Sequence, residues 1–389
     1  MKVAILGCGT EGRRVAQLLA KVDAVSSLIL ADKNKETASQ TANKIGEKAV
    51  ARQVDVTEPE SLRSFFDETD VVFNGVGPYY KYVYGVLEAA IEKRVHYVDI
   101  NDDCDAVEKV FSNPNYDALA KEAGITALCC IGGTPGLMNV LAKHGTLQME
   151  KATAIHCCWV SMYWGREAPT VTDHMLHCLN GEVTQFLGGT FTKVMPFSGN
   201  ETIKLLNPIG PIDSIEVSYC GHSEPITLGR FIPGLEEATL KFSCYEQDAI
   251  NMLEQLAKYG FADQKPVEGL AETPAAYLAK YMASPEGMPY FNITPLYERE
   301  AYKGVDPVGV VMQVEVIGES DGQRVRVVHE VHDKGGLTIA NSAAIAIEGI
   351  VRGEITARGV VAPEACIDTS AFLRRIAEVK GVTLYEEKE

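Results

Sequence analysis

The sequence predicts an α/β fold, a Rossmann-type doubly wound parallel sheet joined to a second α+β domain. Three observations support this prediction. An apolar strand at 2–6 runs directly into the pattern G-x-G-x-x-G, strands and helices then alternate through the first third of the chain, and antiparallel patterns follow from about residue 140. A chain of 389 residues exceeds what one hydrophobic core usually supports, so we expect two domains.

The glycine pattern predicts a dinucleotide-binding turn. Gly7 permits the tight turn, and Gly9 lets backbone amides approach a pyrophosphate. Gly12 lets the following helix pack on the strand, and its N-terminus adds partial positive charge. Thr10 and Glu11 lie inside the same turn and are expected to contact the cofactor.

The expected cofactor is NAD, because the second strand, 27–31, is followed by the acidic residue Asp32. A carboxylate there can accept hydrogen bonds from the ribose hydroxyls and disfavours a 2′-phosphate. Lys33, Arg13 or Arg14 could compensate that charge, so NADP stays open. Further cofactor-lining positions are expected after the third and fourth strands, namely Asp55, Val56, Gly75, Gly77 and Pro78.

Hydrophobic periodicity and turn residues predict the remaining elements in order. In the first domain we expect a helix at 36–45, a strand at 51–56, a helix at 59–66 capped by Thr57, a strand at 71–74, a helix through 83–91, and strands at 96–99 and 125–131. In the second we expect strands at 152–163, 212–219 and 238–245, helices at 247–259 and 274–282, and a hairpin of 308–318 with 323–332 around Asp321-Gly322.

The last elements, helices at 337–351 and 370–379 and a strand at 382–385, are expected to return to the first domain. The predicted dinucleotide-binding domain is therefore 1–130 with 335–389. The predicted substrate-binding and dimerisation domain is 131–334.

Charge and cysteine usage exclude several classes of partner. With 53 acidic against 36 basic residues and a net charge of −17, neither nucleic acid nor an anionic membrane is an expected partner. No run approaches 18 apolar residues, and Met1 directly precedes the first strand, so we expect a cytoplasmic protein without a signal peptide. We expect the ten cysteines to be reduced thiols, because no signal peptide is expected. We expect no metal site, because no C-x-x-C motif occurs and the spacing of the histidine pairs 174/177 and 329/332 is not specific for a metal.

Several motifs in a specific order are similar to those of a known family. They are the N-terminal Gly-Cys-Gly, Gly77-Pro78-Tyr79, the segment 96–99 (HYVD), 135–142 (PGLMNVLA), 221–225 (GHSEP) and 359–364 (GVVAPE). The chain resembles the saccharopine dehydrogenase-like oxidoreductases, and most nearly their lysine 6-dehydrogenase and carboxynorspermidine dehydrogenase branch. Thr134 and Asn139 depart from the G-x-D-P-G turn and downstream histidine of the saccharopine reductases, which argues against saccharopine itself as the substrate.

The resemblance implies hydride transfer between a nicotinamide cofactor and the C–N bond of an amine or amino acid, in a homodimer. Alternatives are a carboxynorspermidine- or saccharopine-type reductase acting on an imine, and a catalytically silent NAD(H)-binding sensor. Oxidation of an alcohol is less favoured, because no Tyr-x-x-x-Lys proton relay occurs near Tyr80.

Two acid-base candidates compete. Asp99 ends the strand 96–99, where it can anchor an ammonium group or exchange its proton, or simply cap the next helix. His222 with Glu224 is the competing base pair, with a structural histidine in a glycine-flanked turn as its alternative.

Other candidates concern substrate binding. Arg230, expected in a loop, can bind a carboxylate through its guanidinium, or it is an ordinary surface arginine. Tyr79 can donate to the nicotinamide amide or the substrate, or pack as an aromatic. The turn Thr134-Pro135-Gly136 precedes an apolar helix, so its amides can hold a ligand oxygen, or the turn is purely structural.

Overall fold

The computed structural model describes residues 1–162, 169–291 and 300–389. The chain divides into two compact units. The first contains Met1–Val140 and Leu337–Val379, and the second contains Leu141–Gly336 and Lys380–Glu389. Among the described residues, no helix has the length and apolar character needed to cross a membrane.

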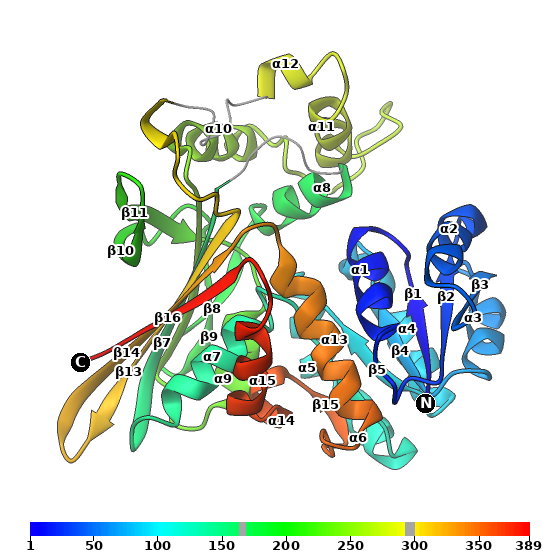
Figure 1. The fold of residues 1–389 in the computed structure, drawn as a ribbon. Helices are drawn as coiled ribbons and strands as arrows, with labels where there is room; N and C mark the ends of the chain where they lie inside the picture. Colours follow the sequence, from blue (N-terminus) through cyan, green and yellow to red (C-terminus); the bar gives the residue numbers. More distant parts are fainter. Residues whose placement is uncertain (163–168, 292–299) are drawn as a thin grey trace. The chain divides into compact units, whose positions relative to one another are not determined.

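The first unit is built on a seven-stranded parallel sheet in the order β15-β6-β5-β4-β1-β2-β3 (Figure 1). This order confirms the predicted doubly wound fold. Its strands are β1 (Lys2–Leu6), β2 (Ser27–Asp32), β3 (Ala49–Gln53), β4 (Val71–Asn74), β5 (His96–Asp99), β6 (Thr126–Leu128) and β15 (Gly359–Val361). The side chains of β4 and those of β1 after Lys2 are buried on both faces, as expected where helices cover a parallel sheet.

The helices of this unit include six that connect successive strands, the last two of them as a pair. They are α1 (Thr10–Leu19), α2 (Lys35–Ile45), α3 (Pro59–Phe66), α4 (Tyr79–Glu92), and the pair α5 (Cys104–Ser112) and α6 (Pro114–Ala123). The C-terminal part adds α13 (Leu337–Val351), α14 (Pro363–Cys366) and α15 (Thr369–Ala377), while α7 (Leu137–Thr146) crosses the boundary between the units. Small side chains along α13, such as Ala343 and Ala346, are buried, and this helix packs on α1.

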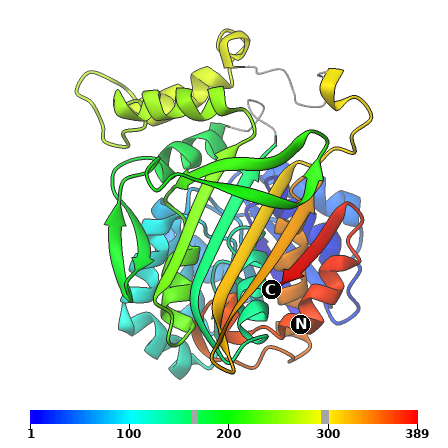
Figure 2. The same ribbon diagram turned by 90° about the vertical axis from the view of Figure 1, so that its left-hand side faces the viewer.

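The second unit is a nine-stranded mixed sheet, whose long strands run side by side in Figure 2. The main order is β10-β11-β12-β7-β13-β14-β16, and β8 and β9 extend from β12. The strands are β7 (Lys151–Ser161), β8 (Val183–Leu187), β9 (Thr190–Val194), β10 (Glu201–Ile209), β11 (Ile212–Tyr219), β12 (Glu237–Cys244), β13 (Val310–Ser320), β14 (Gln323–Asp333) and β16 (Val382–Lys388). Apolar side chains of β10 and β11, including Leu205 and Ile215, form one buried cluster with Val160 of β7 and Val311 of β13.

The helices of the second unit are α8 (Pro169–Cys178), α9 (Glu224–Phe231), α10 (Gln247–Lys258), α11 (Pro274–Met282) and α12 (Met288–Phe291), with a 3₁₀ helix at Glu300–Tyr302. The predicted hairpin is confirmed, since Ser320 pairs with Gln323 across the turn. Asp321 and Gly322 have φ values of 51° and 71°, the two positive angles that a type I′ turn requires.

Several details differ from the sequence predictions. Strand β3 ends at Gln53, before Asp55 and Val56. The N-cap of α3 is Glu58, because the Thr57 hydroxyl donates to the Asp55 carboxylate at 2.7 Å instead. The strand predicted at 382–385 does not join the first sheet. It extends to Lys388 and pairs with β14, which would otherwise be an open edge, so Lys380–Glu389 belongs to the second unit.

Candidate cofactor and acid-base sites

The glycines in the turn between β1 and α1 have two different roles. Some are required by backbone packing, and one leaves space for a ligand. Gly7 has φ of +89°, and a Cβ on Gly12 would lie 1.9 Å from the Gly7 carbonyl oxygen. Both positions therefore require glycine for backbone packing. A Cβ on Gly9 would meet no atom within 4 Å, so this position faces open space where a ligand can approach the backbone. Thr10 and Glu11 begin α1, whose first-turn amides have no partner inside the helix.

Asp32 ties the glycine turn to the second strand. One carboxylate oxygen accepts from the Cys8 amide at 2.8 Å, and the other accepts from the Asn34 amide at 2.9 Å. The Asn34 side chain in turn caps α2 by accepting from the Glu36 amide. Asp32 is thus fixed at the carboxyl end of β2, half-buried, where ribose hydroxyls of a dinucleotide bind in this fold.

The residues after β3 form a second charged group in the same unit. The Lys33 ammonium lies 2.9 Å from the Asp55 carboxylate. The other oxygen of Asp55 accepts from the hydroxyl of Thr57 at 2.7 Å and from its amide at 3.0 Å. These hydrogen bonds, first of all that from the Thr57 hydroxyl, lower the pKa of Asp55 to about 2. Val56 beside it is half-buried.

The turn after β4 also contains one tightly packed glycine and one that faces open space. A Cβ on Gly75 would lie 2.9 Å from the Phe73 ring, whereas Gly77 faces open space. Pro78 follows through a cis peptide bond and is the N-cap of α4. Open space at Gly9 and Gly77, together with the first-turn amides of α1 and the Asp32 carboxylate, fits a bound dinucleotide.

Asp99 lies at the carboxyl end of β5 but is completely buried. Its oxygens accept from the Tyr97 hydroxyl at 2.7 Å, the Cys130 amide at 2.7 Å and the Asn101 amide at 3.1 Å. Burial raises its pKa to about 6, against these hydrogen bonds. This arrangement ties β5 to the segment after β6 and favours a positioning role over contact with a substrate.

Tyr79 belongs to the same polar cluster. Its hydroxyl donates to the Asn74 carbonyl at 3.0 Å, and the Asn74 amide group donates to the Tyr97 hydroxyl at 3.0 Å. Burial, and secondarily the charge of Asp99, raises the pKa of Tyr79 well above its ordinary value. The structure thus brings Tyr79 and Asp99 together through Asn74, which the sequence analysis missed. The signal available was a polar residue ending an apolar strand.

The turn at 134–136 is held by its own backbone and by α7. The Gly132 amide donates to the Pro135 carbonyl at 2.7 Å, and the Gly136 amide donates to the Asn139 side chain at 2.9 Å. Gly136 has φ of +125°, and a Cβ there would lie 2.2 Å from the Gly132 nitrogen. Thr134 and Pro135 are joined by a cis peptide bond. The Gly136 amide, expected to face a ligand, is therefore already engaged within the turn.

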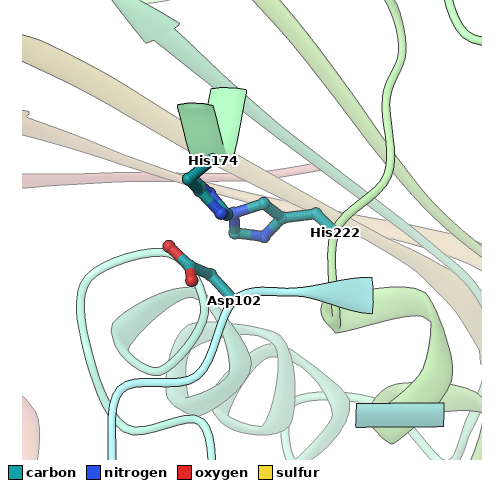
Figure 3. A group of neighbouring side chains, drawn as sticks. All are labelled: Asp102, His174 and His222. Atoms are coloured by element: carbon teal, nitrogen blue, oxygen red, sulfur yellow. The ribbon is translucent and has the colours of Figure 1, made fainter. Parts of the chain in front are cut away.

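His222 and Glu224 form a buried pair in the second unit. The Nδ1 atom of His222 lies 2.6 Å from a carboxylate oxygen of Glu224, the first residue of α9. His222 is 2% exposed and Glu224 is completely buried. The Nε2 atom of His222 makes no hydrogen bond to the described residues and faces the ring of His174 from α8 (Figure 3). Ring nitrogens of the two histidines lie within 4.8 Å of each other.

Two polar atoms next to this pair have no hydrogen-bond partner within the described ranges. They are the indole Nε1 of Trp159 and the hydroxyl of Ser223, both buried. The Trp159 ring centre lies 6.3 Å from that of His222. Because a buried donor without a partner is costly, these atoms indicate a place where a polar ligand or water binds. Sequence reasoning missed Trp159, Ser223 and His174, since it considered His174 only as a metal ligand.

Arg230 is not in a loop as expected. It lies in the last turn of α9, with an exposed side chain, at the opposite end of the helix from Glu224. A Cβ on the preceding Gly229 would lie 2.7 Å from the Phe186 ring, and α9 ends one residue after Arg230, at Phe231. The structure therefore pairs His222 with Glu224 and leaves Arg230 apart from that pair.

Two family descriptions match the chain over nearly its whole length. The saccharopine dehydrogenase NADP binding domain matches residues 3–128, and the saccharopine dehydrogenase C-terminal domain matches residues 132–382. A lipid droplet localized protein of Caenorhabditis elegans is 32% identical over 164 residues, which are 41% of this chain and 38% of that relative. The match thus spans well under half of the relative's length.

One solved structure shows the same fold at low sequence identity, and a second is less similar. Apo saccharopine dehydrogenase (L-Glu forming) from Saccharomyces cerevisiae superimposes with a TM-score of 0.68 at 17% identity, over 100% of this chain and 99% of that one. Diaminopimelate dehydrogenase of C. glutamicum, solved with diaminopimelate, gives a TM-score of 0.45 at 13% identity, over 96% and 95% of the two chains.

Proposed function

Because this chain belongs to the saccharopine dehydrogenase family, we propose that it is an NAD(P)-dependent dehydrogenase that oxidises a C–N bond of an amino acid with NAD, as lysine 6-dehydrogenase does. The first unit binds the dinucleotide at the glycine turn and Asp32. The second unit supplies the proton acceptor. The preference for NAD rests on the carboxylate of Asp32, which disfavours a 2′-phosphate.

The observation that carries this proposal is the buried His222–Glu224 pair beside the unpartnered Trp159 and Ser223 atoms. Glu224 occupies Nδ1 of the imidazole and favours the tautomer that carries its proton there. Nε2 is then the basic nitrogen, and it makes no hydrogen bond to the part of the chain that the structure describes. A histidine oriented by a carboxylate in this way is a suitable general base.

The chemistry requires a free nitrogen lone pair. When bound, NAD(P) would supply a hydride acceptor. His222 takes the proton of the substrate ammonium at Nε2, so that the neutral amine can release hydride from its carbon and become an iminium ion. The iminium ion is then hydrolysed by water, or it loses a proton and the resulting imine cyclises. We assign Asp99 and Tyr79, whose polar groups are already engaged inside the first unit, to holding β5 and β4 in place. Arg230, whose side chain is exposed, stays our candidate for binding the substrate carboxylate.

A substrate panel tests this proposal. Amines, opines and amino acids are each supplied with NAD and with NADP, and nicotinamide absorbance is followed in both directions. We expect turnover of an amino acid with NAD, a large loss of kcat in His222→Ala, and retention of the acidic limb of the pH–rate profile in Asp99→Asn. If Asp99→Asn loses both kcat and that limb while His222→Ala keeps them, Asp99 is the base.

Other results would redirect the proposal. Turnover only from an imine would identify a carboxynorspermidine- or saccharopine-type reductase. Tight NAD(H) binding without turnover of any compound would identify a sensor. We further propose a cytoplasmic homodimer, in keeping with the family resemblance and with ten cysteines that form no disulfide bond within the described residues.

A further inference from the structure

The Lys33–Asp55 ion pair lies next to the residue on which the NAD preference depends. Lys33 directly follows Asp32 at the end of β2, and its ammonium contacts Asp55 at 2.9 Å. The Lys33 side chain is 76% exposed, so it is free to reach other anions when Asp55 does not hold it. Asp55 itself is held by both groups of Thr57.

A 2′-phosphate on the adenosine ribose would bind near Asp32 in this fold, and it needs a cation there. Two of the cations near the turn already form ion pairs with carboxylates. Lys33 pairs with Asp55, and Arg14 pairs with Glu11 at 2.9 Å. A phosphate that binds Lys33 would therefore have to displace Asp55 from it while also facing the charges of Asp32 and Asp55.

We propose that Asp55 determines cofactor specificity, because it withholds Lys33 from a 2′-phosphate and so favours NAD over NADP. This inference rests on the dinucleotide site in the proposed function. The proposed role of the Lys33–Asp55 pair differs from that of Asp32, which would act by its own charge and by hydrogen bonds to ribose. Thr57 contributes by keeping the Asp55 carboxylate in place.

Direct binding of NAD and NADP to the full-length protein tests the proposal. Calorimetry or nicotinamide fluorescence gives the ratio of the two dissociation constants without any need for turnover. In Asp55→Asn we expect the ratio to shift about fivefold toward NADP at low salt, as the removal of a surface ion pair allows. The shift should shrink at high salt, because screening weakens the contact between Lys33 and phosphate. NAD and NADP both contain adenine, so any effect of Asp55 on adenine binding cancels in the ratio of their dissociation constants.

Two further variants make the test specific. Asp67→Asn breaks a matched pair, Lys93–Asp67 at 2.7 Å, and removes the same charge from the same unit. Its ratio should equal that of the wild type. In the double variant Lys33→Met with Asp55→Asn, the shift toward NADP should disappear. An asparagine at position 55 can still accept from the Thr57 amide, and thermal unfolding checks that the variant is folded.

The proposal is overturned if Asp55→Asn leaves the ratio unchanged, if Asp67→Asn shifts it equally, or if the double variant keeps the shift. A wild-type protein that binds neither cofactor would instead overturn the dinucleotide site on which the proposal rests. A protein that binds both cofactors but turns over no amine would contradict the proposed reaction and leave this test intact.

Discussion

At the scale of single residues, the two acid-base candidates differ in what their polar atoms already bind. Both oxygens of Asp99 are engaged by donors from Tyr97, Asn101 and Cys130. Nε2 of His222 has no hydrogen bond to the described residues, while Nδ1 is held by Glu224. A general base needs a lone pair within reach of the substrate, and for this reason we propose His222 rather than Asp99 as the base.

Glu224→Gln tests the orienting role of the carboxylate. Glutamine keeps the size of the side chain but loses the charge that fixes the imidazole tautomer, so kcat should fall about 10- to 100-fold while KM changes little. Steady-state kinetics with the identified substrate provides the measurement.

A second buried pair offers the matched control. His332 Nε2 lies 2.9 Å from Glu330, which also accepts from the amides of Leu206 and Asn207. Glu330→Gln should lower stability and leave kcat of the folded protein unchanged. Equal losses of kcat in both variants would contradict a specific role for Glu224.

The buried Asp99 predicts a pH dependence of stability. Its pKa is raised from 3.8 to about 6 by burial, so the native state binds more protons than the unfolded state between these values. The free energy of unfolding should therefore lose about 3 kcal/mol from this group as the pH rises from about 4 to 6.

The difference between wild type and Asp99→Asn isolates this contribution, because asparagine does not titrate. Urea unfolding at a series of pH values gives the difference curve. We expect it to decline across that window, and a difference curve that is flat or rises with pH would show that Asp99 does not titrate in this way.

At the scale of elements, the glycine turn predicts opposite effects for two neighbouring positions. Gly12→Ala places a Cβ 1.9 Å from the Gly7 carbonyl oxygen, so α1 must shift away from β1 and stability should fall by about 1–3 kcal/mol. Gly9→Ala meets no neighbour within 4 Å, so stability should be kept while dinucleotide affinity falls. Thermal unfolding and NAD titration measure both. A Gly9→Ala variant with full NAD affinity would contradict the site.

Elements with a strong local signal could be predicted from the sequence. The pattern G-x-G-x-x-G with its flanking strands predicted the first sheet. Asp321-Gly322 predicted the hairpin turn. Both signals depend only on residues that are close together in the sequence. The end strand β16 could not be placed, since its partner β14 is fixed by tertiary pairing. The helix that contains Arg230 was missed because glycine and proline flank it.

In the candidate site, too, only residues that are close together in the sequence could be connected by prediction. His222 and Glu224 could be paired from their spacing in one turn. Trp159 and His174 come from a distant strand and helix, so no local pattern connects them to His222. The enclosure of Asp99 depends on the amide of Cys130, which follows a different strand. Position at the end of a strand therefore identified the acidic residue but not its role.

At the scale of the whole molecule, we predict a dimer. The second sheet ends in β10 and β16, and exposed strand edges favour pairing with another chain unless they are protected. The family resemblance also implies dimerisation through this unit. Sedimentation at micromolar concentration should show a single species of twice the chain mass, and a monodisperse monomer would contradict the prediction.

The central claim, hydride transfer from the carbon of a C–N bond to the cofactor, is tested most directly with a labelled substrate. The turned-over amino acid is supplied with deuterium on the carbon that bears the reacting nitrogen, and the reduced cofactor is analysed by mass spectrometry and NMR. We predict that the deuterium appears on the nicotinamide ring. Reduced cofactor without deuterium would contradict the proposed reaction.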